Sequence, residues 1–138
     1  YGVGVSYGTA LIEGCIFDHH RHAVSGNGSP GESYEVRYCI FQGANADTTL
    51  DVHANGSHMG DWSQQGSQPS GRLYRIHHNT EQLTDSGTDQ FMGLVSNPTE
   101  GMYVNNNRMQ YIVYQANQSG RLYMTNNYIG GVFHASGQ

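Results

Sequence analysis

A short polar stretch near the start of the chain concentrates side chains that could do chemistry. It reads Asp18-His19-His20-Arg21-His22 and lies between two apolar stretches. In extended backbone alternate side chains point the same way, so Asp18, His20 and His22 would share one face. With His53 as a fourth ligand, they are candidates for binding Zn²⁺ or Cu²⁺ through neutral imidazoles. The chain lacks the CxxC and HExxH spacings of strong zinc sites, so we expect no cofactor.

A second interpretation of the same region is catalytic. Asp51 and His53 are also two residues apart, and they would follow on the next repeat of a repetitive fold. The catalytic candidates are Arg21, His22, Asp51 and His53. One of the two histidines would act as general base toward a sugar, and Asp51 would orient it. Arg21 or Arg37 would hold a substrate carboxylate. If the protein is an enzyme, this set predicts a polysaccharide lyase or a glycoside hydrolase.

Three further side chains are candidate ligand contacts: Tyr34, Arg37 and Trp62. Trp62 is the only tryptophan and lies in a polar segment, where packing gives no reason for it. Tyrosines gather near the end of the chain, at positions 103, 111, 114, 123 and 128, where they would form either a glycan platform or ladders between repeats. For the histidine region we favour a third interpretation, a hydrogen-bonded surface patch with Tyr34 and Glu35 that pins the loop at Pro30.

The composition limits the classes of partner. Charged residues make up 12 % of the chain, the formal net charge is −5, and all six cations are arginines. Nucleic-acid binding normally leaves a basic footprint, so we expect no nucleic-acid partner. The apolar runs are too short for a membrane span. A chain rich in Gly, Asn and Ser and poor in charge is typical of extracellular β-rich proteins, which predicts an extracellular or cell-surface location.

The elements that would position these side chains form a repeat. Five segments begin with an apolar residue, and the residue three positions later is Cys15, Cys39, Asn79, Asn107 or Asn127, at intervals of 24, 40, 28 and 20 residues. A second apolar segment follows each of them, so each unit reads strand, sharp bend, strand, and then turn residues. The two long intervals predict polar insertions at 56–71 and 82–90. We therefore predict an all-β solenoid of about five to six coils.

The column of Cys and Asn has a physical explanation. A bend between strands needs a residue that tolerates the left-handed conformation, which Asn does at low cost. Its amide can also bond the equivalent Asn one coil away, so Asn79, Asn107 and Asn127 would form a ladder. Cys15 and Cys39 would be small buried substitutes on adjacent coils, and we expect free thiols because stacked parallel strands seldom give disulfide geometry.

The repeats resemble those of the right-handed parallel β-helix superfamily, which includes pectate-lyase-like enzymes. "IHHNT" at 76–80 and "GMYVNNN" at 101–107 carry this resemblance. The stretches 19–38 and 50–54 also resemble secreted archaeal and bacterial β-helix proteins of unassigned activity. The lyases of the superfamily use clustered acidic calcium ligands and a basic proton acceptor, and neither pattern is evident in this chain. The resemblance therefore implies a fold and a location, but no catalytic residues.

The sequence predicts one β-helix domain over residues 1–138, or a piece cut from a longer β-helix. No capping element is evident at either end, and open coils can stack head to tail on copies of themselves or on neighbouring coils. Our leading expectation is therefore an extracellular structural module that self-associates into a fibre, a sheath or a surface layer, and is not an enzyme. The first alternative is a protein that binds or acts on polysaccharide, and the second is a copper- or zinc-binding β-helix.

Overall fold

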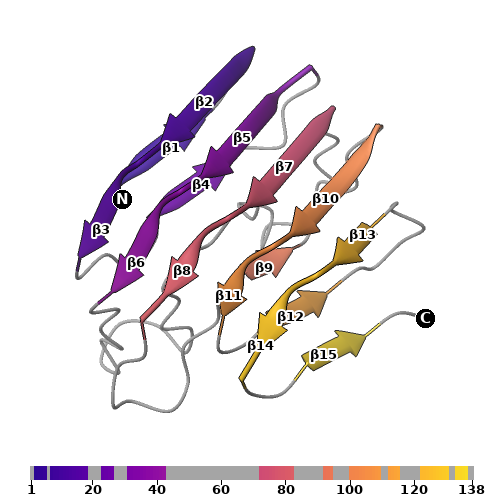
Figure 1. Ribbon diagram of the computed structural model, residues 1–138. Coiled ribbons are helices and arrows are strands. Elements are labelled where there is room, and N and C mark those ends of the chain that lie inside the picture. Colours follow the sequence, from indigo (N-terminus) through magenta and orange to yellow (C-terminus); the bar gives the residue numbers. More distant parts are fainter. Residues whose placement is uncertain are drawn as a thin grey trace, which may run out of the picture.

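A computed structural model describes residues 2–5, 7–18, 23–26, 31–42, 72–82, 92–94, 100–109, 112–115, 122–130 and 133–136. Every regular element within these ranges is a β-strand, and none of them contains a helix. Ten of the strands form two five-stranded sheets in which all neighbours are parallel (Figure 1). The prediction of an all-β parallel β-helix of about five coils is thereby confirmed.

The strands alternate between the two sheets along the chain, so each coil places one strand in each sheet. In spatial order the first sheet contains β2 (Thr9–Glu13), β5 (Ser33–Arg37), β7 (Leu73–His77), β10 (Gly101–Asn105) and β13 (Leu122–Thr125). The second sheet contains β3 (Ile16–Asp18), β6 (Ile40–Gln42), β8 (Thr80–Glu81), β11 (Arg108–Met109) and β14 (Tyr128–Ile129). The expected insertions at 56–71 and 82–90 lie outside the described residues, apart from Gln82.

The coils contain three strands, whereas the expected unit had two: the second predicted apolar segment forms the third strand, and the short second-sheet strand directly after the corner was not counted. β4 (Val24–Gly26), β9 (Met92–Leu94), β12 (Ile112–Gln115) and β15 (Phe133–Ser136) each follow the second-sheet strand of their coil. β9, β12 and β15 form one parallel sheet, and β4 pairs with β1 (Val3–Val5). Since β1 precedes β2 in the chain, this third layer begins one coil earlier than the first sheet does.

The register of the first sheet stacks the repeats as their spacing predicted. Ile12, Val36, Ile76, Val104 and Met124 are successive partners across β2, β5, β7, β10 and β13. The column residues follow the same register, because the carbonyls of Cys15, Cys39, Asn79 and Asn107 each accept a hydrogen bond of 2.8 to 2.9 Å from the coil above. The five corners therefore lie in one file along the axis, and the unequal intervals are absorbed elsewhere in the coils.

The core is made of inward-facing rows that repeat from coil to coil. Val36, Ile76 and Val104 are fully buried in one row. In the row that begins at Phe17, this ring stacks on Phe41 with centroids 5.1 Å apart. Period-two alternation explains the pattern, because strand residues on either side of a buried one face outward. The strands contain only two to five residues each. Stability therefore depends on repeating similar contacts from coil to coil along the axis.

The left-handed residue of each corner lies one position earlier than expected. Tyr38, His78, Asn106 and Asn126 have φ of 54° to 56°, and Gly14 has φ of 65°. The column residues themselves do not have positive φ, so the proposal that their Asn side chains were selected for this conformation is wrong. The left-handed residue turns the chain at the corner, and the column side chain after it then points inward among buried groups.

Hydrogen bonds explain the residue types in the column. Asn79 Nδ2 donates to Asn107 Oδ1, and Asn107 Nδ2 donates to Asn127 Oδ1, both at 3.0 Å. Each Nδ2 also donates to a main-chain oxygen of the coil below, as from Asn107 to Ile76 at 2.9 Å. The Cys39 thiol takes the equivalent place, with Sγ 3.7 Å from the Ile12 oxygen. Both thiols are free, and Cys39 is buried whereas Cys15 is only partly so.

Candidate functional site

Most of the histidine region lies outside the described residues. His19, His20, Arg21, His22, Asp51, His53 and Trp62 all belong to that part of the chain. Asp18 ends β3 at an exposed position, beside Gln42 of β6. The metal and catalytic interpretations of this region therefore stay predictions, as does the surface patch around Pro30.

Tyr34 does not lie at the surface, which corrects its assignment as a ligand contact. Its side chain is 2 % exposed and stacks on Tyr74 of the next coil, with ring centroids 4.2 Å apart. Burial, together with the nearby Tyr74 and Glu32, raises the pKa of the Tyr34 hydroxyl well above its usual value. The physical reason is the alternation of side chains along a strand. Tyr34 is two residues from the buried Val36, so both side chains lie on the inward face.

Arg37 is at the surface but is already committed to two carboxylates. Its Nε donates to Glu13 Oε1 at 3.1 Å and its Nη1 to Glu35 Oε1 at 2.8 Å. The same Glu35 oxygen lies 3.1 Å from His77 Nε2. Burial acts to raise the pKa of Glu35, but the bonds from His77 and Arg37 outweigh it and lower the pKa. This cluster links three coils through their outward rows, and the assignment of Arg37 as a ligand contact stays a prediction.

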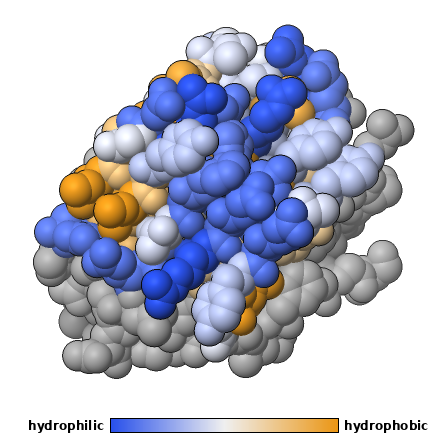
Figure 2. Space-filling model, in the orientation of Figure 1, coloured by the Kyte–Doolittle hydropathy of each residue, from blue (hydrophilic) through white to orange (hydrophobic). Residues whose placement is uncertain are grey.

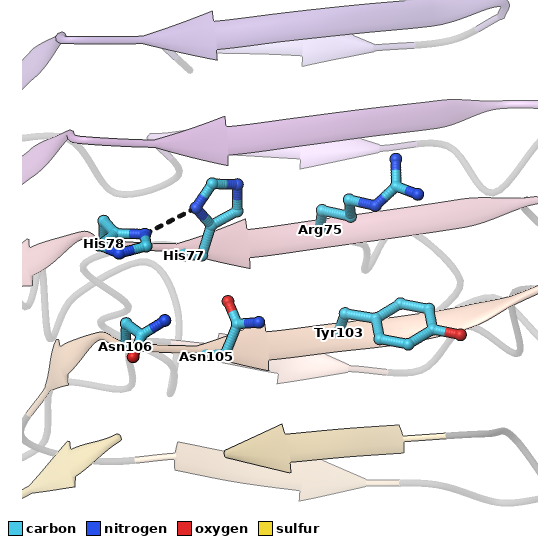
Figure 3. Close-up of a pocket in the computed structure, with 6 residues that line it drawn as sticks. All are labelled: Arg75, His77, His78, Tyr103, Asn105 and Asn106. Carbon is cyan, nitrogen blue, oxygen red and sulfur yellow. Dashed lines mark hydrogen bonds between the residues drawn. The ribbon is translucent and has the colours of Figure 1, made fainter. Parts of the chain in front are cut away.

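His77 and His78 form a pair at the end of β7. Their Nδ1 atoms are 2.8 Å apart, and their ring planes meet at 81° (Figure 3). Adjacent residues of a strand normally point to opposite faces. Here φ of 56° at His78 turns its side chain outward beside His77, next to the ring of Tyr38 one coil below. The left-handed corner thus places two imidazoles in contact on one surface.

A pocket of about 330 Å³ adjoins this pair, and we refer to it as the corner pocket (Figure 3). It lies on the outer surface of the first sheet and spans β7 and β10. It is lined by Arg75, His77, His78, Tyr103, Asn105 and Asn106. The Tyr103 ring stacks on Tyr123 of the next coil, with centroids 4.8 Å apart and planes 11° from parallel. Figure 2 shows that this side of the molecule is mainly hydrophilic.

Arg75 is the positive group of the corner pocket. It is exposed, and it forms no ion pair with the described residues. Glu35, its partner in the strand register, is instead bonded to Arg37 and His77. Within the part of the chain that the structure describes, the Arg75 guanidinium is therefore not held by a carboxylate.

Comparisons with protein-family models, curated proteins and solved structures find no match. Within the ranges that the structure describes, no helix is long and apolar enough to cross a membrane. In the same ranges, no three side chains of His, Cys, Asp or Glu lie close enough to hold a metal together.

Most residues of the corner pocket are not among those predicted from the sequence. Tyr103 belongs to the predicted glycan platform, whereas Arg75, Asn105 and Asn106 belong to no predicted site. A usable signal was present, because the column fixes the register and the register places Arg75 beside Tyr103. The contact between His77 and His78 could not be read in this way, since it depends on the left-handed φ of His78.

Proposed function

We propose that the corner pocket and the tyrosines beside it bind an acidic polysaccharide outside the cell, within a protein of the parallel β-helix superfamily. The observation that carries this proposal is the exposed Arg75 guanidinium, which forms no ion pair within the described ranges, beside the stacked Tyr103 and Tyr123 rings. An exposed tyrosine face packs against the apolar side of a sugar ring. The guanidinium matches a uronate carboxylate with two parallel hydrogen bonds. Asn105 and Asn106 supply amide donors and acceptors for hydroxyl groups.

The repeat of the coil favours a polymeric ligand over a small one. Neighbouring parallel strands are about 4.8 Å apart, so the outward rows form a regular array along the axis. Tyr103 and Tyr123 occupy the same row on consecutive coils, as do Arg75 and Glu35. A sugar chain lying across the strands would therefore meet one outward side chain of this row on each coil, including Arg75, Tyr103 and Tyr123.

We propose binding without catalysis at this pocket. Glycoside hydrolysis needs a carboxylic acid that stays protonated near neutral pH, which requires a raised pKa. Among the described residues, Glu35 is the acidic group that contacts the pocket lining, and its pKa is lowered because His77 and Arg37 bond its ionised form. The catalytic alternative keeps its own candidates, Arg21, His22, Asp51 and His53. Depolymerisation of an acidic polysaccharide that is lost in Asp51→Asn and His53→Ala would support that alternative.

The binding proposal is tested by affinity electrophoresis in gels containing polygalacturonate or alginate, with neutral dextran as the reference polymer. We expect retardation only in the acidic polymers, and its loss in Arg75→Gln and Tyr103→Ala. The matched control is Arg108→Gln, which removes one exposed positive charge from β11 in the second sheet. Equal retardation of Arg75→Gln and wild type would contradict the proposal, and equal losses in Arg75→Gln and Arg108→Gln would indicate general charge attraction.

A second candidate function is structural self-association, favoured by the outermost described strands of the first two sheets. β2 and β3 expose Leu11 and Ile16, which are 55 % and 65 % exposed. At the opposite edges β13 and β14 expose Tyr123 and Tyr128, which are 46 % and 66 % exposed. Continuing the register from one copy to the next would pack Leu11 on Tyr123 and Ile16 on Tyr128. Edge strands also carry backbone groups that can pair with another chain.

The third layer sets a condition on this stacking. If β2 of one copy paired with β13 of another, β1 of the first and β15 of the second would occupy the same place in the third layer. The reason is that β1 belongs to the coil before β2, whereas β15 belongs to the coil of β13. Head-to-tail growth therefore requires that one of these two strands moves aside. We expect removal of residues 1–5 to promote larger species in size-exclusion chromatography and negative-stain microscopy. Leu11→Glu with Ile16→Glu should abolish them, and a monodisperse 15.2 kDa species in every case would count against this candidate.

A further inference from the structure

The hydrogen bond between His77 and Glu35 leaves the unprotonated Nδ1 of His77 facing His78. His77 Nε2 lies 3.1 Å from Glu35 Oε1, and an ionised carboxylate can only accept, so the proton of a neutral His77 is on Nε2. Its Nδ1 is then unprotonated, and it lies 2.8 Å from His78 Nδ1. One proton, carried by His78, holds these two nitrogens together. A divalent cation can replace a proton in such an arrangement.

Glu35 also matches a feature of established metal sites. A histidine that ligates a metal nearly always donates its other ring N–H to a carboxylate, a carbonyl or a water, which fixes its tautomer and orientation. Glu35 has this relation to His77, and Arg37 in turn holds Glu35 at 2.8 Å. The ligand nitrogen of His77 is therefore oriented by a supporting carboxylate that is itself anchored by an ion pair.

The distance between the two Nδ1 atoms indicates the geometry of the ion. With metal–nitrogen bonds of about 2.0–2.1 Å, a separation of 2.8 Å corresponds to an N–metal–N angle of roughly 85–90°. That angle joins adjacent positions of a square-planar or tetragonal ion, the preferred geometry of Cu²⁺ and Ni²⁺. A tetrahedral Zn²⁺ ion would need the nitrogens about 3.3 Å apart.

We propose that His77 and His78 form a surface site for a divalent ion of tetragonal preference, Cu²⁺ or Ni²⁺, bound through both Nδ1 atoms. The exposed His78 ring turns so that its Nδ1 lone pair points at the ion while the two Nδ1 atoms keep about their present separation, and its proton moves from Nδ1 to Nε2. No net proton is released from the neutral pair, and no oxidant or reductant is required. Water fills the remaining positions, with the Asn105 and Asn106 amides one coil away at the same corner (Figure 3).

This site is distinct from the metal site expected at Asp18, His20 and His22, and it does not depend on the polysaccharide proposal. The corner position of His78 is occupied by Tyr38 on the coil below and by Asn106 and Asn126 on the next two coils, so the turn itself accepts several residue types.

The test is Ni²⁺ titration by calorimetry in metal-free buffer, with Ni²⁺ chosen because thiols such as Cys15 do not reduce it. The variants are His77→Asn and His78→Asn, which copy Asn105 and Asn106 of the next coil and so preserve the corner. We expect each variant to lose one Ni²⁺ equivalent, and Glu35→Gln to retain it with about tenfold weaker affinity. His134→Asn is the matched control, because it removes one histidine elsewhere in the chain.

Thermal unfolding supplies a second readout. A saturating ion that binds only the folded state raises its stability, so Ni²⁺ should raise the Tm of wild type and His134→Asn above that of His77→Asn and His78→Asn. Unfolding in EDTA checks that the Asn variants keep the wild-type Tm. Unchanged stoichiometry in both Asn variants, or equal losses in His134→Asn, would overturn the proposal. If an Asn variant failed to fold, the affinity of Glu35→Gln would still decide the role of the supporting carboxylate.

Discussion

Tyr34 and Tyr74 stack in the core with ring centroids 4.2 Å apart, yet their hydroxyl groups differ in hydrogen bonding. The Tyr74 hydroxyl donates to the buried Glu32 carboxylate at 3.2 Å, whereas the buried Tyr34 hydroxyl has no hydrogen-bond partner among the described residues. An unsatisfied buried hydroxyl costs about 1–3 kcal/mol. We therefore expect Tyr34→Phe to leave the free energy of unfolding unchanged or to raise it, and Tyr74→Phe to lower it by about 1–2 kcal/mol. Urea denaturation of both variants measures the difference, and a larger loss for Tyr34→Phe would contradict the assignment.

The buried Tyr34 hydroxyl also predicts a loss of stability at alkaline pH. Burial raises its pKa in the folded protein, while in the unfolded chain a tyrosine ionises near pH 10. Above that pH the unfolded state binds fewer protons than the folded state, so stability falls as pH rises. Wild type should lose stability more steeply than Tyr34→Phe between about pH 10 and 11.5. Parallel slopes in urea denaturation over this range would show that Tyr34 ionises normally when folded.

Asn107 is expected to be the most sensitive position in the column. Its Oδ1 accepts from the main-chain N and Nδ2 of Asn79, and its Nδ2 donates to Ile76 and Asn127. Asn107→Ala leaves several buried groups without partners and should cost about 3 kcal/mol or more. Asn127→Ala should cost less, because Asn127 is partly exposed and water can replace its bonds.

The control for the column is Asn105→Ala, since Asn105 points outward two residues before Asn107. A change at such a surface position is usually within about 0.5 kcal/mol. Denaturant midpoints of the three variants give the order Asn107, Asn127, Asn105 from most to least destabilised. An equal effect at Asn105 and Asn107 would mean that the side-chain bonds of the column contribute little.

The two thiols should react with very different rates. Cys39 is 1 % exposed, and burial raises its pKa, so little of the reactive thiolate forms. Cys15 is partly exposed on the neighbouring coil. We expect an aromatic disulfide reagent to modify Cys15 in the native protein, and to modify Cys39 only after unfolding in urea. Cys15→Ser isolates the Cys39 reaction, and rapid native labelling of that variant would contradict the buried position.

The corner conformation can be tested at Gly14, which has φ of 65°. A Cβ added there meets no heavy atom within 4 Å, so the cost of Gly14→Ala comes from the backbone conformation alone. We expect Gly14→Ala to destabilise the protein by about 1–2 kcal/mol. Gly14→Asn should cost less, because Asn106 and Asn126 adopt the same conformation on later coils. If Ala and Asn were equivalent by chemical denaturation, the left-handed φ would not limit this corner.

The repeat made the fold predictable from sequence. Each corner residue from Cys15 to Asn127 follows an apolar residue at the same distance, and a solenoid can stack identical corners while longer segments project between them. The predicted register is the one that the structure shows, from Ile12 through Met124. The inward position of Tyr34 followed from the same register and could have been derived from its spacing to Val36.

Only the tertiary structure determined which residue turns each corner and what that turn brings together. The chain contains polar residues at both 78 and 79, and nothing in their types shows that His78 takes the left-handed conformation while Asn79 points inward. The contact of His77 with His78 depends on that φ. The contact of His77 with Glu35 depends on the pairing of β7 with β5, because the two residues are 42 positions apart in the sequence. Local residue types set the spacing of the coils, whereas these contacts arise from a backbone angle and a side-chain rotation that are fixed only when the coils pack.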